Sequence, residues 1–232
     1  MKEEFTQFIQ KYEDLAATVD QVFEKVRSQY QREVVCKNGC SDCCHALFDL
    51  TLIEAIYINM KFREKFQEEP ERREEILELA NKADRLAYKI KKDAMKSVVR
   101  GRPEGEVLED LAAKKIRCPL LEADETCLLY QDRPITCRLY GIPTAIGGKG
   151  HTCGLSGFEK GQPYPTVNVD AIHQKLIHIS AELTQSIGSR HARLPEVLVP
   201  LSMALLTEYD EEYLGVRDPA ADDAEKKEGR EG

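Results

Sequence analysis

Four cysteines lie within nine residues of this sequence, in the pattern C-x3-C-x2-C-C, and they are Cys36, Cys40, Cys43 and Cys44. On a helix these positions would share one face. Asn38-Gly39 is a turn signal, however, and it favours a loop for the first half of the stretch. A short helical turn would then carry Cys43 and Cys44 at its N-terminus, where the helix dipole stabilises thiolates. In either arrangement several sulfur atoms converge.

The remaining four cysteines fall in one later segment and are Cys118, Cys127, Cys137 and Cys153. Thiolate ligands select zinc, copper(I) or iron–sulfur clusters. A zinc ribbon normally has two C-x2-C knuckles, and here only Cys40 and Cys43 have that spacing. The later spacings, C-x8-C, C-x9-C and C-x15-C, suit a cluster that accepts sulfurs from several directions. We predict that the eight cysteines ligate an iron–sulfur cluster, preferably 4Fe-4S, with zinc as the alternative.

Eight thiols exceed the four that one zinc ion or one four-iron cluster requires. The sequence therefore leaves open two sites, or one site with spare cysteines. His45 and His151 adjoin cysteines and are either substitute ligands or outer residues. Buried structural thiols and a redox pair are the non-metal alternatives. The C-x3-C-x2-C spacing also occurs in radical S-adenosylmethionine enzymes, but Asp42 stands where those proteins have an aromatic residue.

The charge and hydropathy of the sequence argue against several classes of function. The net charge of −8 over 232 residues argues against non-specific nucleic-acid binding. The charged N-terminus lacks the apolar core of a signal peptide, and no apolar run approaches membrane-spanning length. We therefore expect a cytoplasmic protein without nucleic-acid or membrane partners, in a compartment where thiols stay reduced. Its protein partners are unknown.

The hydrophobic pattern predicts helices at residues 2–35, 51–66, 71–100, 104–116, 169–187 and from 195 onward. The helix at 71–100 would bury Leu79 and Leu86, and the last helix would bury Val197 and Leu198 and be kinked at Pro200.

The segment that carries the second cysteine group lacks the periodicity of a long helix. It contains a small hairpin around residues 122–125, then a short helix with Pro134 at its first position and Gly141 just past its end. Gly147-Gly148 lies in a turn. Because residues 118–153 contain few large apolar side chains, we expect metal to supply much of their order.

The expected fold class is mainly α: one helical metal-binding domain over residues 1–217, with a small cysteine-rich hairpin and loop module as its core at 36–153. The tail at 218–232 lacks large apolar residues, and we predict that it is disordered.

Together these motifs resemble a known family, the CxxxCxxCC cysteine-cluster proteins, described as zinc- or iron-chelating. The resemblance rests on C-x3-C-x2-C-C, Cys118-Pro119-Leu120-Leu121, Cys127-Leu128-Leu129-Tyr130, Arg133-Pro134-x2-Cys137-Arg138-x-Tyr140-Gly141 and Cys153, with Leu50-Thr51 and Glu54. It covers roughly residues 36–153. The resemblance implies metal chelation. A similar cysteine cluster accompanies flagellin lysine methylases, which keeps a modification role open.

Arg133 and Arg138 match the family signature. They could offset the negative charge of a thiolate-rich site or donate hydrogen bonds to its sulfurs. The alternative is ordinary ion pairing with carboxylates such as Asp132.

Our leading hypothesis is a cytosolic metal-binding protein whose cluster is structural or serves electron transfer or sensing. The alternatives are a metal-cluster-dependent enzyme that modifies a protein or small molecule, and a metal-delivery or assembly protein. No Ser-His-Asp order, H-E-x-x-H or paired-acid motif stands out in the sequence, so enzymatic activity stays open.

Overall fold

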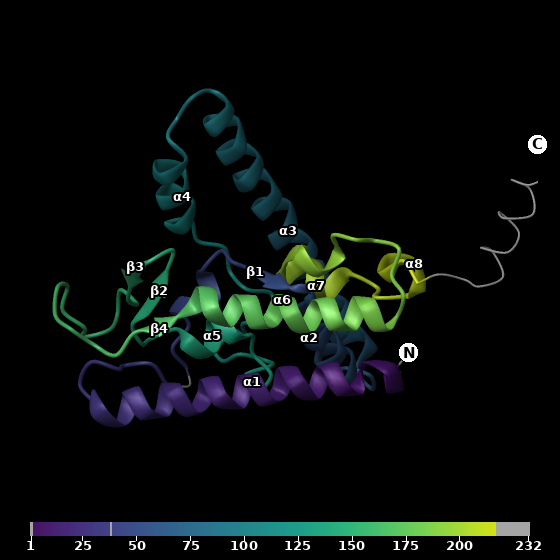
Figure 1. Cartoon of the computed structure of the whole chain (residues 1–232), viewed down its shortest axis with the longest axis horizontal. Helices are drawn as coiled ribbons and strands as arrows, with labels where there is room; N and C mark the ends of the chain where they lie inside the picture. Colours follow the sequence, from purple (N-terminus) through teal and green to yellow (C-terminus); the bar gives the residue numbers. More distant parts are fainter. Residues whose placement is uncertain (1, 38, 217–232) are drawn as a thin grey trace, which may run out of the picture.

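A computed structural model describes residues 2–37 and 39–216 of the chain, which is mainly α-helical as the sequence predicts (Figure 1). The predicted disordered tail at 218–232 lies outside the described residues. The helices are α1 (Lys2–Gln29), η1 (Asp42–His45), α2 (Leu52–Lys65), α3 (Pro70–Val99), α4 (Glu104–Ala112), α5 (Ile135–Leu139), α6 (Val169–Ser186), η2 (Leu194–Glu196), α7 (Leu201–Leu206) and α8 (Glu211–Leu214). The strands are β1 (Asp49–Thr51), β2 (Thr144–Ile146), β3 (Lys149–His151), β4 (Val167–Asn168) and β5 (Leu198–Pro200).

Helix α2 is the central helix and is buried on nearly all sides. The predicted capping box starts it, with the Thr51 and Glu54 side chains each bonded to the other's backbone. Ile53 and Ile56 belong to a core shared with α1, α5 and α6. Phe62, on the other side of the helix, belongs to a second core shared with α3 and α7. Each such buried side chain contributes about 1.5–3 kcal/mol, so this frame is held by apolar packing.

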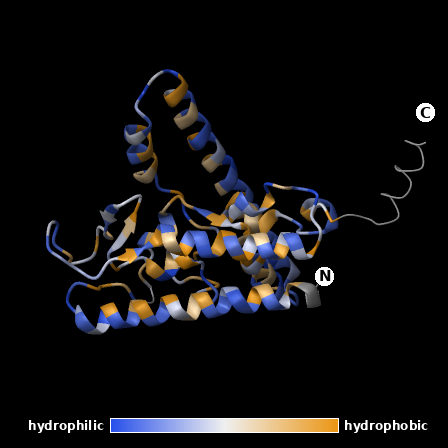
Figure 2. Cartoon of the chain, in the orientation of Figure 1, coloured by the Kyte–Doolittle hydropathy of each residue, from blue (hydrophilic) through white to orange (hydrophobic). Residues whose placement is uncertain are grey.

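Helix α1 presents the predicted apolar stripe to the first core. Tyr12, Val19 and Phe23 on this stripe are buried, and Figure 2 shows the alternation of hydrophobic and hydrophilic residues along the helix. The helix ends at Gln29, earlier than the predicted residue 35. The backbone carbonyl of Glu33 instead accepts a hydrogen bond from the Gly157 N–H at 2.8 Å. A long-range contact therefore overrides the local helical pattern.

Helices α3 and α4 form a hairpin that stands out from the body of the molecule (Figure 1). The described residues of α3 that are buried are Ile76, Ala80 and Ala87. The prediction that Leu79 and Leu86 face inward is wrong, since they are 47% and 45% exposed. A projecting helix has too few neighbours to cover a wide apolar face. The hairpin returns the chain to the cysteine region at residue 118.

The predicted helix from residue 195 is replaced by η2, β5 and α7. Strand β5 pairs antiparallel with β1, with Leu50 opposite Val199. Pro200 caps the start of α7 and does not kink a longer helix. The residue before a proline disfavours α geometry, so Val199 is extended and pairs with β1. In consequence Leu198 is 48% exposed.

A small sheet in the order β3-β2-β4 leads into α6. Gly147 and Gly148 connect β2 to β3 with φ of 55° and 75°, the geometry of a tight hairpin turn. The predicted turn is confirmed. Among the described residues, no helix is long and apolar enough to cross a membrane.

Candidate metal centre

The structure brings the two cysteine groups together around one cavity of about 360 Å³. Seven cysteines line it: Cys36, Cys40, Cys43, Cys44, Cys118, Cys127 and Cys137. The backbone joins the two groups directly, since the Cys118 N–H donates to the Cys44 carbonyl at 2.7 Å and the Ile116 N–H to the His45 carbonyl at 3.0 Å. All eight cysteines are free thiols.

Each thiol is presented by a short local element. Cys43 and Cys44 lie on the 3-10 turn η1, at the place where the sequence predicted a helical turn. Cys127 follows a tight loop closed by an antiparallel bridge to Leu121. Cys137 lies on α5, which begins after Pro134 and ends before Gly141. Pro134 is the N-cap of this helix, one position before the predicted first helical residue.

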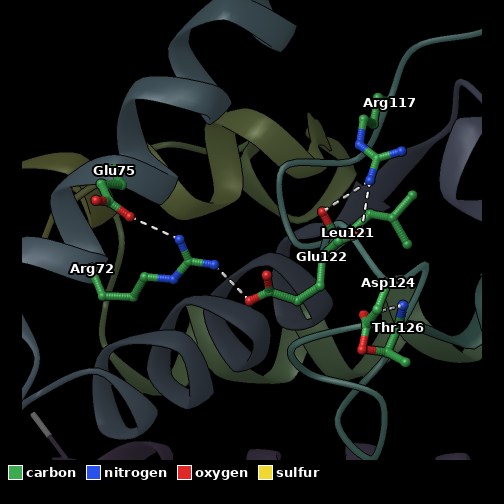
Figure 3. A network of polar contacts seen from close by, with 7 residues as sticks. All are labelled: Arg72, Glu75, Arg117, Leu121, Glu122, Asp124 and Thr126. Carbon is green, nitrogen blue, oxygen red and sulfur yellow. Dashed lines mark hydrogen bonds and ion pairs between the residues drawn. The ribbon is translucent and has the colours of Figure 1, made fainter.

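Polar contacts hold the loop between Cys118 and Cys127 (Figure 3). Arg72 on α3 donates to Glu75 at 2.8 Å and to Glu122 at 2.6 Å. Arg117 donates to the Glu122 carbonyl at 2.7 Å, and the Thr126 hydroxyl donates to Asp124 at 2.7 Å. The loop geometry is therefore held by protein groups.

The expectation that metal supplies much of the order of residues 118–153 is narrowed by the buried side chains of this segment. Six of its apolar side chains are buried: Leu120, Leu121, Leu129, Ile135, Leu139 and Ile142. These side chains anchor residues 118–142 to the two cores. Strand β3, by contrast, is exposed throughout. Metal-dependent order is therefore expected mainly at residues 144–153.

Hydrogen bonds among the thiols set their protonation. Cys137 and Cys44 donate to the Cys43 sulfur, which lowers the pKa of Cys43 and raises the pKa of both donors. Burial raises the pKa of Cys118 to about 12, and burial followed by neighbouring thiolates raises that of Cys36 to about 11. Cys43 therefore ionises more readily than Cys44 and Cys137, and metal binding to these thiols must release protons.

Arg138, one of the two signature arginines, lines the cavity and is held there by structural contacts. Its guanidinium donates to Asp20 at 2.5 Å and to the carbonyls of Gln131 at 2.5 Å and Arg133 at 2.8 Å. Arg138 therefore forms an ordinary ion pair, which was the alternative raised from the sequence, but its partner is Asp20 and not Asp132. Asp132 instead accepts a hydrogen bond from the Tyr57 hydroxyl at 2.9 Å.

Arg133 lines the cavity. Its guanidinium lies 4.2 Å from the centre of the Tyr130 ring, and it donates to the Tyr130 carbonyl at 2.7 Å. Its positive charge adds to the thiol hydrogen bonds that lower the pKa of Cys43. Arg133 is therefore positioned to offset thiolate charge.

The two arginines make a matched pair of substitutions. Arg133→Gln should weaken metal binding by about tenfold, the scale typical of residues that support metal ligands. It should lower the free energy of unfolding by only about 1 kcal/mol, from the lost contacts with Tyr130. Arg138→Gln should instead lower that free energy by roughly 1–3 kcal/mol, because it leaves the carbonyls of Gln131 and Arg133 without a donor. The loss of the ion pair adds little, since the Asp20 side chain is 42% exposed. Chelator competition and urea unfolding measure the two effects. Unchanged affinity in Arg133→Gln would contradict this assignment.

Glu54 connects the start of α2 with the start of α5. One carboxylate oxygen accepts from the Thr51 N–H at 3.1 Å and the Thr51 hydroxyl at 3.0 Å. The other accepts from the Ile135 N–H at 3.1 Å, two residues before Cys137. The capping box was evident from sequence, whereas the link to α5 depends on the fold.

Replacing Glu54 by glutamine should change how the free energy of unfolding depends on pH, because the Glu54 carboxylate links α2 to α5. Burial raises the pKa of Glu54, against the hydrogen bonds from Thr51 and Ile135 that lower it. The folded chain therefore binds this proton more readily than the unfolded chain, and the stability linked to it is lost as pH rises through the raised pKa. The advantage of the parent over the variant in urea unfolding should shrink as pH rises from 4. A constant difference across pH would refute this assignment.

The two candidate histidines differ in their surroundings. The Nδ1 atom of His45 lies 3.0 Å from the Ser41 carbonyl oxygen, and His151 is exposed on β3. From the sequence, Asp42 was not singled out as part of the site. In the structure the Asp42 carboxylate contacts the Cys153 thiol at 3.6 Å, and its position between Cys40 and Cys43 was the available signal.

Within the part of the chain that the structure describes, no three His, Cys, Asp or Glu side chains already stand in the geometry that holds a single ion. What the residues share is a cavity lined by seven thiols and by both signature arginines, Arg133 and Arg138. This donor set fits a thiolate-ligated metal.

Comparison with curated proteins and with solved structures found no match. One family model does match, over residues 35–154, which is just over half of the chain and contains all eight cysteines. The model describes a putative zinc- or iron-chelating domain, and it is the family that the motifs indicated. The chain therefore belongs to the CxxCxxCC family of cysteine-cluster domains.

Proposed function

We propose that this chain is a cytosolic metal-binding protein that holds an iron–sulfur cluster, preferably 4Fe-4S, through its clustered cysteines. The observation that carries the proposal is the common cavity of about 360 Å³, lined by seven thiols from separate segments. The cysteine-rich core at residues 36–153 and the helices on either side of it would form one metal-binding domain over residues 1–217. Free thiols at every cysteine agree with a reducing compartment.

The size of the cavity and the number of thiols favour a cluster over one zinc ion. A structural zinc site is closed, with four ligands about 2.3 Å from the metal. A cluster spreads its iron atoms and accepts thiolates from several directions. Cys43 and Cys44 on η1, Cys118 and Cys127 beside the 117–126 loop, and Cys137 on α5 approach the cavity from three such elements.

When bound, the cluster would supply one-electron redox chemistry or a structural cross-link between these elements. The chain's own contribution is to gather the thiols and to exclude bulk water with apolar walls. Arg133 would offset part of the thiolate charge. A structural, electron-transfer or sensing role is consistent with this arrangement.

The direct test is metal analysis of protein isolated without oxygen. The isolated protein is expected to be brown, to absorb near roughly 400 nm as thiolate-ligated iron does, and to contain iron and acid-labile sulfide. Colourless protein with stoichiometric zinc, which takes up no iron on anaerobic reconstitution, would establish the zinc alternative.

One observation favours the enzyme alternative. Beyond the thiols the cavity is walled by apolar side chains of α3 and α7, including Ala83, Ala87 and Leu201. Its volume lies within the range of small-molecule sites. An apolar substrate lodged there would lie beside the metal. The test is to add small apolar amides and record the spectrum of the cluster. A change in the parent that is absent from Ala87→Phe, in which the larger side chain blocks the cavity, would support this role over a purely structural one.

A further inference from the structure

A stripe of exposed apolar side chains runs along the outer face of the α3–α4 hairpin. Tyr88, Met95 and Val99 on α3 are 64%, 64% and 80% exposed, and Leu108 on α4 is 54% exposed. The three residues of α3 are spaced by seven and four positions, so they share one face of the helix. Single exposed apolar side chains are ordinary, but a stripe of them on a hairpin that stands clear of the body (Figure 1) indicates an interaction surface.

The two helices of this hairpin carry opposite charges. Residues 85–102, which are the outer half of α3 and the loop after it, contain seven lysines and arginines and one aspartate. Helix α4, Glu104–Ala112, contains four carboxylates and no basic residue. Since α4 packs against α3, the hairpin has a basic side and an acidic side, which the net charge of the whole chain conceals.

Part of this charge has no partner within the part of the chain that the structure describes. Asp110 pairs with Arg102 at 2.9 Å, and the Lys92 ammonium lies 5.4 Å from the centre of the Tyr88 ring. Among the described residues, two basic side chains on α3 and two acidic ones on α4 form no ion pair: Arg85, Lys89, Glu104 and Glu109. A binding surface that carries both charges around an apolar patch would satisfy all of them.

We propose that the hairpin binds the same hairpin of a second copy of this chain, giving a twofold-symmetric dimer joined by a four-helix bundle. With the twofold axis along the hairpins, α3 of each copy lies beside α4 of the other at the same height. The lysines of one copy then face the carboxylates of the other, and this contact occurs twice. The apolar stripe would be covered between them, as the apolar faces of other four-helix bundles are.

Charge is the reason to favour a second copy over other occupants. An anionic membrane would attract α3 but repel the four carboxylates of α4 and a chain of net charge −8. An acidic protein would leave α4 unmatched in the same way, whereas a second copy matches both helices at once. This proposal goes beyond the proposed function and does not depend on which metal the chain binds. Since Ala83 and Ala87 on the inward face of α3 line the metal cavity, the dimer would also fix one wall of that cavity.

The test is sedimentation equilibrium of the full-length protein purified without oxygen. The parent should change from monomer to dimer in the micromolar range, because one face of a short hairpin is smaller than a standard interface. Lys89→Glu with Lys92→Glu places acids opposite acids. Glu104→Lys with Glu109→Lys places bases opposite bases. Each double variant should raise the dissociation constant of the dimer by about tenfold or more.

An equimolar mixture of the two double variants is the decisive measurement. In a mixed dimer the altered α3 of one copy faces the altered α4 of the other, and the charges are opposite again. The two unaltered helices face each other as in the parent. The mixture should therefore dimerise nearly as tightly as the parent, although neither variant does so alone.

Lys25→Glu with Lys175→Glu is the matched control, because it makes the same change of charge at exposed positions of α1 and α6. It should dimerise as the parent does. Val99→Glu, at the most exposed position of the stripe, buries an unpaired charge in the dimer and should also raise the dissociation constant about tenfold. This variant keeps the proposal testable if a double variant loses its helical circular dichroism.

Three outcomes would overturn the proposal. They are a parent that stays monomeric throughout the micromolar range, double variants that dimerise as well as the parent, and a mixture that dimerises no better than its two components. If the monomeric parent instead sediments with phosphatidylserine vesicles, the face binds an anionic membrane.

Discussion

Replacing Cys137 by serine is expected to remove the metal cluster while most of the helical structure remains. Cys137 lies on α5, lines the cavity and donates to the Cys43 sulfur, so it is central to the group of thiols. A serine hydroxyl is a poor ligand for metals that select thiolates. Iron and sulfide per chain should fall by about tenfold or more. Circular dichroism should change little, because α2 and its neighbours are held by two apolar cores.

Hydrogen exchange should locate the consequence of metal loss. Residues 144–153 should lose protection, since β3 is exposed. Residues 118–142 should stay protected by their buried side chains and by the Arg72 and Arg117 contacts. Thr136→Ser, an exposed change of similar size on the same helix, is the control. If the metal-free variant protects 144–153 as well as the parent does, metal does not order this hairpin.

Gly141→Ala is expected to be the most destabilising small substitution near the site. Gly141 has φ of +107°, which L side chains rarely adopt, and an added β-carbon would lie 2.6 Å from the Cys36 β-carbon. Backbone strain of about 1–3 kcal/mol and overpacking of about 1–3 kcal/mol together predict a loss of roughly 3 kcal/mol or more in the free energy of unfolding. The clash should also displace Cys36 and weaken metal binding.

Gly101→Ala is the matched control for that substitution. Gly101 has φ of +92°, but an added β-carbon there would meet nothing within 4 Å. It therefore shares the backbone strain and lacks the contact with Cys36. Urea unfolding of both variants isolates the effect of the contact, and equal losses of stability would show that Gly141 matters for its backbone alone.

The sequence by itself determined the chemistry and most of the helices. Eight cysteines with these spacings indicated a thiolate metal site, because cysteine is the side chain that soft metals select. The Thr51–Glu54 capping box and the apolar periodicity of α1 and α6 located helices, since these signals act within a few residues of chain. Gly141 and the Gly147-Gly148 pair marked turns for the same local reason.

Only the tertiary structure decided how these pieces meet. It ended α1 at Gln29, turned the predicted last helix into β5, and left Leu79 and Leu86 exposed on a projecting helix. It also distinguished the two arginines, since both line the cavity but Arg138 pairs with Asp20 and Arg133 stacks on Tyr130. Each outcome depends on partners far away in the sequence, whose contacts contribute free energy only once the chain has folded. Local patterns of residues cannot encode such contacts, so the cavity and the place of Asp42 beside Cys153 come from the fold alone.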